Sequence, residues 1–254
     1  MEKIIKHCLY TNWSSQYKKL SFKTEFLELT AKEVDFILTN FDNNLLGRMK
    51  KCLIGRTLII KISEKLKLFE NGAFIKLETR SPKNNYHAET INYRQMSWQD
   101  VIKSLYSERI LDDLIQYHYS DIPCRLLFRE WFYIHKYEEF RCFIKNKKFA
   151  GISQYFYNIY SDKDRENQPY TSKLINQSAK YIEKSILEFL DKEILPDLPC
   201  RDLVVDLWFD DFREIKLIEI NPYGLSDPCI LSYKNMEKIG YYEFLYNKLE
   251  GFSL

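Results

Sequence analysis

The sequence predicts an α+β protein with an antiparallel sheet in its second half. Short segments with alternating or β-branched residues are interspersed with segments whose apolar residues recur every three or four positions, a mixture typical of strands and helices. Beyond residue 125, strand-like segments are joined by short polar turns, which indicates hairpins. With 45% hydrophobic and 29% charged residues among 254, the chain can bury a core.

The first expected elements are a strand, a capped helix and a second strand. Residues 22–29 alternate apolar and polar side chains, as a half-buried strand does. Thr30-Ala-Lys-Glu33 has the spacing of a capping box, which predicts a helix that runs to about Asn40. Arg56–Ile62 is rich in β-branched residues, so we expect a strand there.

A helix, a turn and a third strand are expected next. Glu64–Glu70 has helical patterning, and Asn71-Gly72 is a turn signal that leads into the strand-like segment Ala73–Leu77. The polar connection from Glu78 to Gln95 is longer than a routine turn. Because binding residues are often found on loops, this connection is a candidate functional loop.

The middle of the chain predicts a helical region followed by a strand. Ser97-x-x-Asp100 is a second capping signal, and the helical pattern after it reaches about Tyr119 with a break near Ser107. Pro123 ends this region, because proline cannot continue a helix. Arg125–Trp131 is strand-like.

The second half contains a hairpin and a long amphipathic helix. Glu139–Lys145 and Phe149–Tyr155 flank the polar turn Asn146-Lys147, as the strands of a hairpin do. Ser172–Ile194 carries apolar residues at three-to-four spacing, which predicts one long helix with an apolar face. A short helix is expected near Tyr241–Leu249.

A second predicted hairpin, Leu203–Phe209 with Lys216–Asn221, is the most informative segment. Asp206 lies within its first apolar strand, and Glu219 and Asn221 lie in the second. An unpaired carboxylate within such an apolar strand is costly, which favours a charged partner or a metal for Asp206.

The geometry of this hairpin depends on the length of its turn. We expect an even number of connecting residues, such as Asp210–Arg213. Phe209 then pairs with Glu214. In this register Asp206 lies opposite Leu217. Because side chains alternate between the two faces, one face holds Asp206, Leu217, Glu219 and Asn221, and the other holds Val205, Ile218 and Ile220.

Carboxylate and amide oxygens on one sheet face suit a hard cation. Mg²⁺ prefers oxygen ligands, takes few carboxylates, and keeps its remaining positions for water and nucleotide phosphates. Asp206, Glu219 and Asn221 supply such a set and are our candidate metal ligands. In the alternative interpretation, Asp206 forms a buried ion pair and Glu219 is a solvated residue on an edge strand.

Composition argues against several other classes of site and partner. The net charge of +2 gives no general attraction to nucleic acid or anionic lipid, so we expect neither as a partner. The six cysteines lack zinc spacing and are expected as reduced thiols, and the four histidines show no catalytic or metal spacing. Only 7 glycines argue against a long Gly-rich phosphate loop. Because a signal peptide and a long apolar stretch are both missing, we expect a cytoplasmic location.

Four segments in chain order form a recognisable set. They are Phe74-Ile-Lys-Leu-Glu-Thr-Arg-Ser-Pro-Lys83, Leu127-Phe-Arg-Glu-Trp131, Glu139-Phe-Arg-Cys-Phe143 with Ile152-Ser-Gln154, and Val205-Asp206 through Asn221-Pro-Tyr-Gly224. Together they resemble the eukaryotic cell division cycle protein 123 (D123) family of ATP-grasp proteins. Trp13 also lies where the family keeps an N-terminal tryptophan. Glu219 replaces the Asp that is usual in this family, and Glu is common at this position in ATP-grasp enzymes at large.

The resemblance implies an ATP-grasp fold of two α+β lobes with the nucleotide between them. We expect the N-terminal lobe over residues 1–125 and the C-terminal lobe, with the metal-binding hairpin, over residues 126–254. The resemblance further implies an ATP-dependent assembly factor that binds the gamma subunit of translation initiation factor 2. The implied cofactors are ATP and Mg²⁺.

The ligand-binding residues of the family match positions of this sequence. The resemblance implies that the nucleotide is bound by Lys76, Arg80, Lys83, Arg129, Arg141, Asp206 and Asn221, and the metal by Asp206, Glu219 and Asn221. Alternatives stay open for the basic residues. Lys76 is alternatively a strand lysine facing water, and Arg141 a partner of Glu139 on its own strand. Arg80 and Lys83 lie either in a solvated loop or in a lid over the phosphates.

Two classes of function stay open, because a fold does not decide function. In the first, the protein is a binding module whose ATP state controls its grip on a translation-factor subunit. In the second, it is a ligase or transferase that forms an acyl phosphate on an unknown substrate and passes the acyl group to an amine. A third interpretation, without nucleotide, is an α+β scaffold with an acidic surface hairpin.

Overall fold

The computed structural model describes residues 6–40, 45–83, 85–119, 123–155, 168–238 and 240–246, without the side chains of Lys136 and of residues 168–174. The chain divides into two compact units. Unit 1 consists of residues 1–22 and 133–254, and unit 2 consists of residues 23–132. The predicted boundary at residues 125 and 126 lies near the second crossing between the units. Residues 1–22, however, belong with the later part of the chain, which the sequence did not predict.

Unit 2 is built on a three-stranded antiparallel sheet in the order β1-β3-β2. Its strands are β1 (Thr24–Leu29), β2 (Ala73–Leu77) and β3 (Cys124–Glu130). All three were predicted from their strand-like sequences. One face of the sheet is apolar and joins the core of the unit, whereas the other face carries several charged residues.

The described residues of unit 2 form six α-helices. They are α3 (Ala31–Thr39), α4 (Leu45–Lys51), α5 (Leu53–Leu66), α6 (Tyr86–Thr90), α7 (Trp98–Ser104) and α8 (Glu108–His118). Five of these helices, all except α6, bury apolar side chains with Ile75 and Phe128 of the sheet, among them Ile37, Met49, Leu58, Val101 and Leu114. The polar connection after β2 contains α6, which the sequence did not predict.

Both predicted capping boxes are present. At the start of α3, Thr30 Oγ1 accepts from the Glu33 backbone N–H at 3.3 Å, and Glu33 Oε2 accepts from the Thr30 N–H at 2.8 Å. Burial alone raises the pKa of Glu33, but hydrogen bonds from Lys61 and Thr30 outweigh it and leave this pKa below its ordinary value. Ser97 and Asp100 form the same arrangement at α7.

The predicted strand at Arg56–Ile62 is wrong, because this segment lies in α5. Leu58, Ile62 and Leu66 recur at helical spacing and are buried, while Ile60 is 57% exposed on the outer side. β-branched residues lower helix propensity only slightly. Burial of the helical apolar face therefore decides the structure here.

Unit 1 contains a five-stranded sheet in the order β7-β6-β4-β5-β8. Its strands are β4 (Glu139–Lys145), β5 (Lys148–Gln154), β6 (Leu203–Asp210), β7 (Glu214–Pro222) and β8 (Phe244–Leu245). Both predicted hairpins, β4–β5 and β6–β7, are confirmed. At the other end of the chain, α2 (Ser15–Leu20) precedes Ser21, which bridges to Leu217 of β7.

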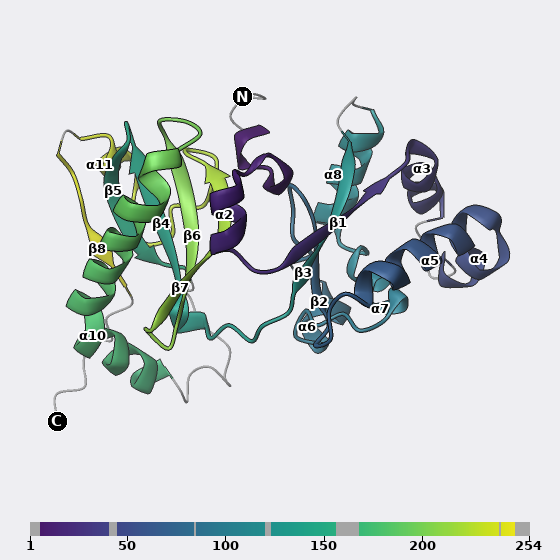
Figure 1. Ribbon diagram of the computed structural model, residues 1–254, viewed down its shortest axis with the longest axis horizontal. Coiled ribbons are helices and arrows are strands. Elements are labelled where there is room, and N and C mark those ends of the chain that lie inside the picture. Colours follow the sequence, from purple (N-terminus) through teal and green to yellow (C-terminus); the bar gives the residue numbers. More distant parts are fainter. Residues whose placement is uncertain are drawn as a thin grey trace. The chain divides into compact units, whose positions relative to one another are not determined.

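The long helix α10 (Gln168–Phe189) crosses one face of this sheet (Figure 1). Its Tyr181 ring lies 6.1 Å from the ring of Phe209 in β6. A π-helical stretch, Leu190–Ile194, continues α10 and confirms the predicted long helix. Because side chains alternate along β6, Asp206 points to the face opposite Phe209.

The end of unit 1 differs from its prediction. Instead of a helix near Tyr241–Leu249, the described residues contain β8, which pairs parallel with β5; residues 247–249 lie outside the described part. A short helix, α11 (Tyr233–Met236), packs with the apolar cluster of Phe143, Ala150, Val204, Leu231 and Met236. In the described ranges, no helix combines the length and apolar character needed to cross a membrane.

Candidate functional site

The β6–β7 hairpin carries the three candidate metal ligands. Asp210 pairs with Glu214, so the turn consists of the three residues Asp211–Arg213 and the predicted even connection is wrong. Asp211 and Phe212 in this turn have positive φ angles of 42° and 56°. An odd turn alone would place Asp206 and Glu219 on opposite faces.

A β-bulge compensates for the odd turn. The register shifts just beyond Asp206, where Ile218 is the extra residue of β7, and Asp206 faces Glu219. Turn and bulge together place Asp206, Glu219 and Asn221 on one face. The predicted common face is therefore confirmed, although by a different route. Leu217, on the turn side of the bulge, lies on the other face, contrary to the prediction.

The three polar side chains on this face are hydrogen-bonded to one another. Asn221 Nδ2 donates to Asp206 Oδ2 at 2.9 Å and to Glu219 Oε2 at 3.4 Å. The amide nitrogen thus lies between two carboxylates and reduces their mutual repulsion.

Arg141 of β4 is the charged partner of Asp206. Its Nε lies 2.7 Å from Asp206 Oδ1 and its Nη2 lies 2.8 Å from Oδ2, which is a bidentate ion pair. The remaining terminal nitrogen, Nη1, donates to the carbonyl of Asp227 at 2.9 Å. The ring of Tyr155 lies 4.5 Å from the guanidinium carbon.

Both members of this pair are buried, with 5% exposure for Arg141 and 2% for Asp206. Burial disfavours the charged guanidinium, but the Asp206 carboxylate outweighs this effect and raises the pKa of Arg141 above its ordinary value. The alternative interpretation of Asp206 as part of a buried ion pair is thus confirmed. The partner of Arg141 is Asp206, whereas Glu139 was the alternative considered from sequence.

The segment after β7 is fastened to the same end of the sheet. Besides the Arg141 contact, Asp227 Oδ1 accepts from the Cys229 N–H at 2.8 Å. Ser153 Oγ of β5 accepts from the Ile230 N–H at 3.2 Å. Ser153 belongs to a sequence segment that matched the family, whereas nothing in the sequence indicated Asp227. These contacts fix the backbone beside the carboxylates.

The side chains on this face are of the types that bind magnesium. It offers two carboxylates, from Asp206 and Glu219, and the side-chain amide of Asn221. Among the described residues, no group of three His, Cys, Asp or Glu side chains is close enough together to hold a metal ion without other ligands. A carboxylate has about four acceptor positions, and three on Asp206 accept from Arg141 and Asn221. As a metal ligand, Asn221 would have to turn its amide so that Oδ1 replaces Nδ2.

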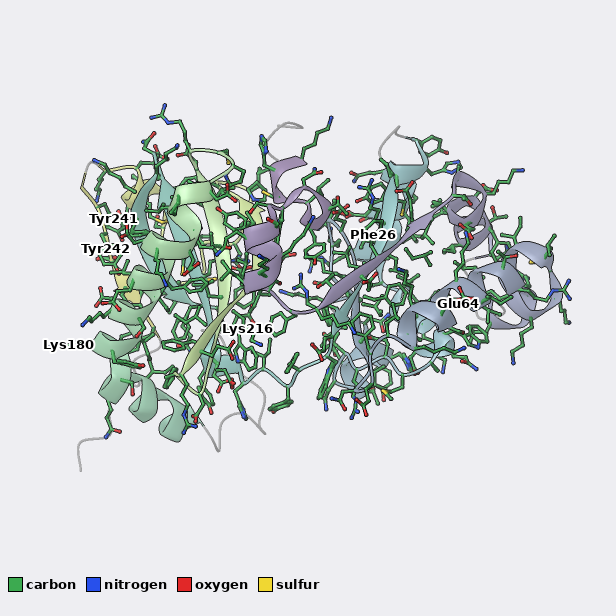
Figure 2. The ribbon with its side chains drawn as sticks, viewed as in Figure 1. Phe26, Glu64, Lys180, Lys216, Tyr241 and Tyr242 are labelled. Atoms are coloured by element: carbon green, nitrogen blue, oxygen red, sulfur yellow. The ribbon has the colours of Figure 1, made fainter. Side chains whose placement is uncertain are left out.

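Two other predicted residues share one face of the unit 2 sheet. Arg129 pairs with Phe74 and Lys76 pairs with Leu127, so Lys76 and Arg129 are diagonal neighbours on the face opposite the core. Their exposures are 5% and 6%. Lys76 therefore does not face water, which was the alternative for this residue. Phe26 lies on the same face and is 43% exposed (Figure 2).

The structure gives Arg80 a partner of its own. Arg80 Nε lies 3.0 Å from Asp113 Oδ1 of α8, and Asp113 also accepts from the Thr79 hydroxyl. Thr79 is in turn 3.2 Å from the Tyr117 hydroxyl. Asp113 is buried, so it fixes the chain directly after β2. The carbonyl of Lys83 accepts from the Ser107 hydroxyl at 3.5 Å.

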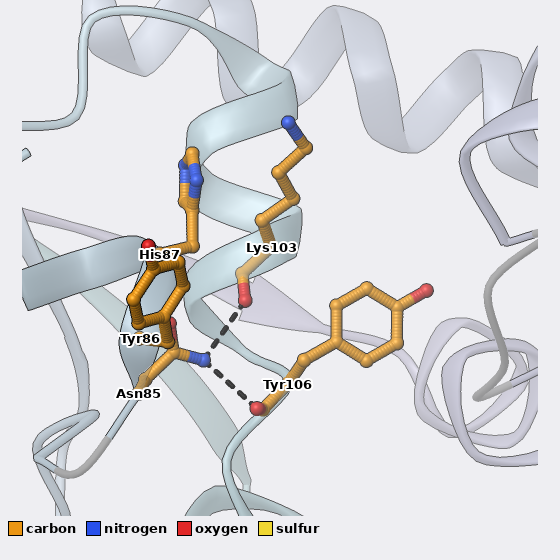
Figure 3. Close-up of a pocket in the computed structure, with 5 residues that line it drawn as sticks. All are labelled: Asn85, Tyr86, His87, Lys103 and Tyr106. Atoms are coloured by element: carbon orange, nitrogen blue, oxygen red, sulfur yellow. Dashed lines mark hydrogen bonds between the residues drawn. The ribbon is translucent and has the colours of Figure 1, made fainter. Parts of the chain in front are cut away.

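Unit 2 also contains a pocket with a volume of about 300 Å³ (Figure 3). It is lined by Asn85, Tyr86, His87, Lys103 and Tyr106. The Asn85 amide at its base donates to the carbonyls of Lys103 and Tyr106 at 3.0 and 2.8 Å, which joins α6 to the end of α7. None of the predicted site residues lines this pocket.

Comparison with known proteins identifies the family. The D123 family model matches residues 56–248. The chain is 24% identical to the translation initiation factor eIF2 assembly protein of Xenopus tropicalis over 91% of this chain and 78% of that protein. Identity to the protein of the same name from Xenopus laevis is 27%, over 70% of this chain and about half (53%) of that one. The cell division cycle protein 123 of Candida glabrata is 32% identical over 48% of this chain and 31% of its own length.

The fold also matches a solved structure. Cdc123 from Schizosaccharomyces pombe superimposes with a TM-score of 0.70 at 23% identity, over 98% of both chains. This likeness shows a shared α+β fold along the whole chain. The family model covers most of the sequence, including β2, β3 and both hairpins that carry the candidate residues. This chain belongs to the D123 family.

Proposed function

We propose that this chain is an assembly factor for translation initiation factor eIF2 and that it binds the gamma subunit of that factor. The observation that carries this proposal is family membership together with the names of the relatives. The eIF2 assembly protein of Xenopus tropicalis aligns with 91% of this chain, so the likeness extends over both units.

We further propose that the chain has an ATP-grasp fold and binds Mg²⁺–ATP. Asp206, Glu219 and Asn221 would hold the magnesium ion, which neutralises phosphate charge when bound. Arg141 lies beside them and can direct its remaining N–H groups toward phosphate oxygens. Lys76 and Arg129 supply further positive charge in unit 2. The support for this assignment is the common face of the hairpin and the buried cation beside it.

Binding to the gamma subunit tests the main proposal. The purified gamma subunit is immobilised, and association of the full chain is measured by biolayer interferometry with Mg²⁺–ATP, with ATP plus EDTA, and without nucleotide. We expect association that Mg²⁺–ATP strengthens, through higher affinity for one of two conformations. If association is undetectable under all three conditions, the proposal is wrong.

The same samples distinguish assembly from ligation. A ligase or transferase releases ADP over many turnovers once its acceptor is present, and it leaves a covalent product with a changed mass. We expect neither multiple turnover nor a covalent adduct with the gamma subunit. Steady ADP release with an adduct, and no stable complex, would favour the alternative activity.

The metal assignment is tested with two variants of the same strand. Glu219→Gln removes the charge of a proposed ligand, whereas Glu214→Gln removes the charge of an exposed residue at the start of β7. Calorimetric titration should show an affinity for Mg²⁺–ATP at least about tenfold lower for Glu219→Gln and unchanged for Glu214→Gln. Equal affinities for both variants would remove Glu219 from the site.

A further inference from the structure

Trp208 lies where both chain connections between the units meet unit 1. The chain passes from unit 1 to unit 2 after Phe22 and returns at Tyr133. Trp208, in β6, is 5% exposed and contacts Phe22 at the first crossing and Glu138, which lies between the second crossing and β4.

The first connection is held by ring stacking. Phe22, the last residue of unit 1 before the crossing, stacks on Trp208 with centroids 5.5 Å apart and an interplanar angle of 20°. Lys216 (Figure 2) pairs with Trp208 across β6 and β7, and its Nζ lies 5.8 Å from the centroid of the Phe22 ring. Rigid aromatic contacts of this kind define orientation as well as contact area.

The second connection is held by a buried carboxylate. Glu138 is 2% exposed and accepts from Trp208 Nε1 at 2.9 Å. It also accepts from the backbone N–H groups of His135 at 3.2 Å and Asp211 at 3.1 Å. Because a buried carboxylate is costly without donors, the indole N–H fixes the segment before β4 to β6.

Trp208 is also next to the candidate site along the strand. Asp206 and Trp208 are two positions apart in β6, so their side chains are on the same face. Their partners in β4, Arg141 and Glu139, follow the same spacing. A displacement of this part of β6 would therefore reach the two connections through one side chain.

We propose that Trp208 is a positioning residue that couples occupancy of the Asp206 face to the two connections between the units. The coupling rests on the proposed nucleotide function. The anchoring of both connections by Trp208 does not depend on it.

Hydrogen exchange on the full chain tests both parts. Trp208→Phe keeps a ring for Phe22 but loses the N–H to Glu138, and Phe22→Leu keeps the N–H but loses the stacking. Phe209→Leu, at the next residue of β6, which is also buried but on the other face, is the matched control. Without nucleotide, amide exchange should be about tenfold faster in residues 132–138 for Trp208→Phe and around Lys23 for Phe22→Leu. It should not be faster at those sites for Phe209→Leu.

Mg²⁺–ATP then tests the coupling. In the unmodified chain it should change exchange in both connections, and in Trp208→Phe this response should be lost while affinity for Mg²⁺–ATP stays within about threefold. Unchanged exchange in Trp208→Phe and Phe22→Leu, or equal acceleration in Phe209→Leu, would overturn the anchoring. A preserved nucleotide response in Trp208→Phe would overturn the coupling. If the unmodified chain does not bind Mg²⁺–ATP, the coupling fails with the nucleotide proposal, whereas the nucleotide-free comparison still decides the anchoring.

Discussion

Two Arg–Asp pairs, one in each unit, are built from similar parts and differ in burial. In unit 1, Arg141 and Asp206 form a bidentate pair in which the two side chains are 6% and 2% exposed. In unit 2, Arg80 contacts the buried Asp113 through one nitrogen, and its own side chain is 40% exposed. Both arginines were predicted nucleotide contacts. If Asp206 is lost, the buried Arg141 guanidinium cannot be solvated by water, whereas the half-exposed Arg80 can be solvated if Asp113 is lost.

The largest effect is expected from removing the carboxylate of the buried pair. Asp206→Ala leaves the Arg141 guanidinium buried without its counter-charge, which should lower the free energy of unfolding by about 3–5 kcal/mol. Urea denaturation without ligand measures this loss. Asp210→Ala, at the end of the same strand, should change stability by no more than about 0.5 kcal/mol. Similar losses for both variants would show that the pair is not the cause.

Replacing both members of the buried pair should restore much of this stability. In Arg141→Met with Asp206→Leu, neither charge is left without a partner, so we expect the double variant to be within about 2 kcal/mol of the unmodified chain. The double variant should nevertheless not bind Mg²⁺–ATP, as calorimetric titration would show. If the double variant is less stable than Asp206→Ala, the pair contributes more to the free energy of unfolding than the neutralisation of one charge by the other.

A smaller effect is expected from the half-exposed pair of unit 2. Asp113→Ala removes the acceptor of the Thr79 hydroxyl and of Arg80, and should cost about 1–3 kcal/mol of unfolding free energy. Asp112→Ala, at the exposed neighbouring position of α8, is the matched control. A loss as large as that of Asp206→Ala would contradict the difference between the two pairs.

The smallest change in stability is expected for Arg80→Ala, at about 0–1 kcal/mol, because its partner stays hydrogen-bonded to Thr79. This variant therefore separates binding from folding. If Arg80 contacts the nucleotide, affinity for Mg²⁺–ATP should fall about tenfold at nearly unchanged stability. Arg109→Ala, an exposed residue of α8, should change neither quantity. Unchanged affinity in Arg80→Ala would assign Arg80 to the structure of the loop alone.

Local signals predicted most elements of the fold. The capping boxes at Thr30 and Ser97 mark helix starts because their donors and acceptors lie within one turn. The turn Asn146-Lys147 has positive φ angles of 50° and 60° at its two residues, as a two-residue hairpin turn of the primed type requires. The predicted strand within α5 is wrong because burial of Leu58 and Ile62 at helical spacing outweighs the slight preference of β-branched residues against a helix.

The sequence predicted which residues share the site but not which contacts they make. The common face of Asp206 and Glu219 was expected from an even turn, and it results instead from an odd turn and a bulge at Ile218, which no local rule specifies. The partnerships of Arg141 with Asp206 and of Arg80 with Asp113 join residues 65 and 33 positions apart. Only the pairing of strands and helices in three dimensions brings them together.

The hydrogen bond between the Glu130 N–H and the Lys23 carbonyl, at 2.8 Å, means that unit 2 begins and ends at one place. Residues 23–132 are thus an insertion in the chain of unit 1, with their own sheet and apolar core. Such an insertion can be excised as a fragment whose termini lie together, and a short linker from Phe22 to Tyr133 can close the remaining polypeptide. Measuring ligand binding by each polypeptide would then show which ligands each unit binds on its own.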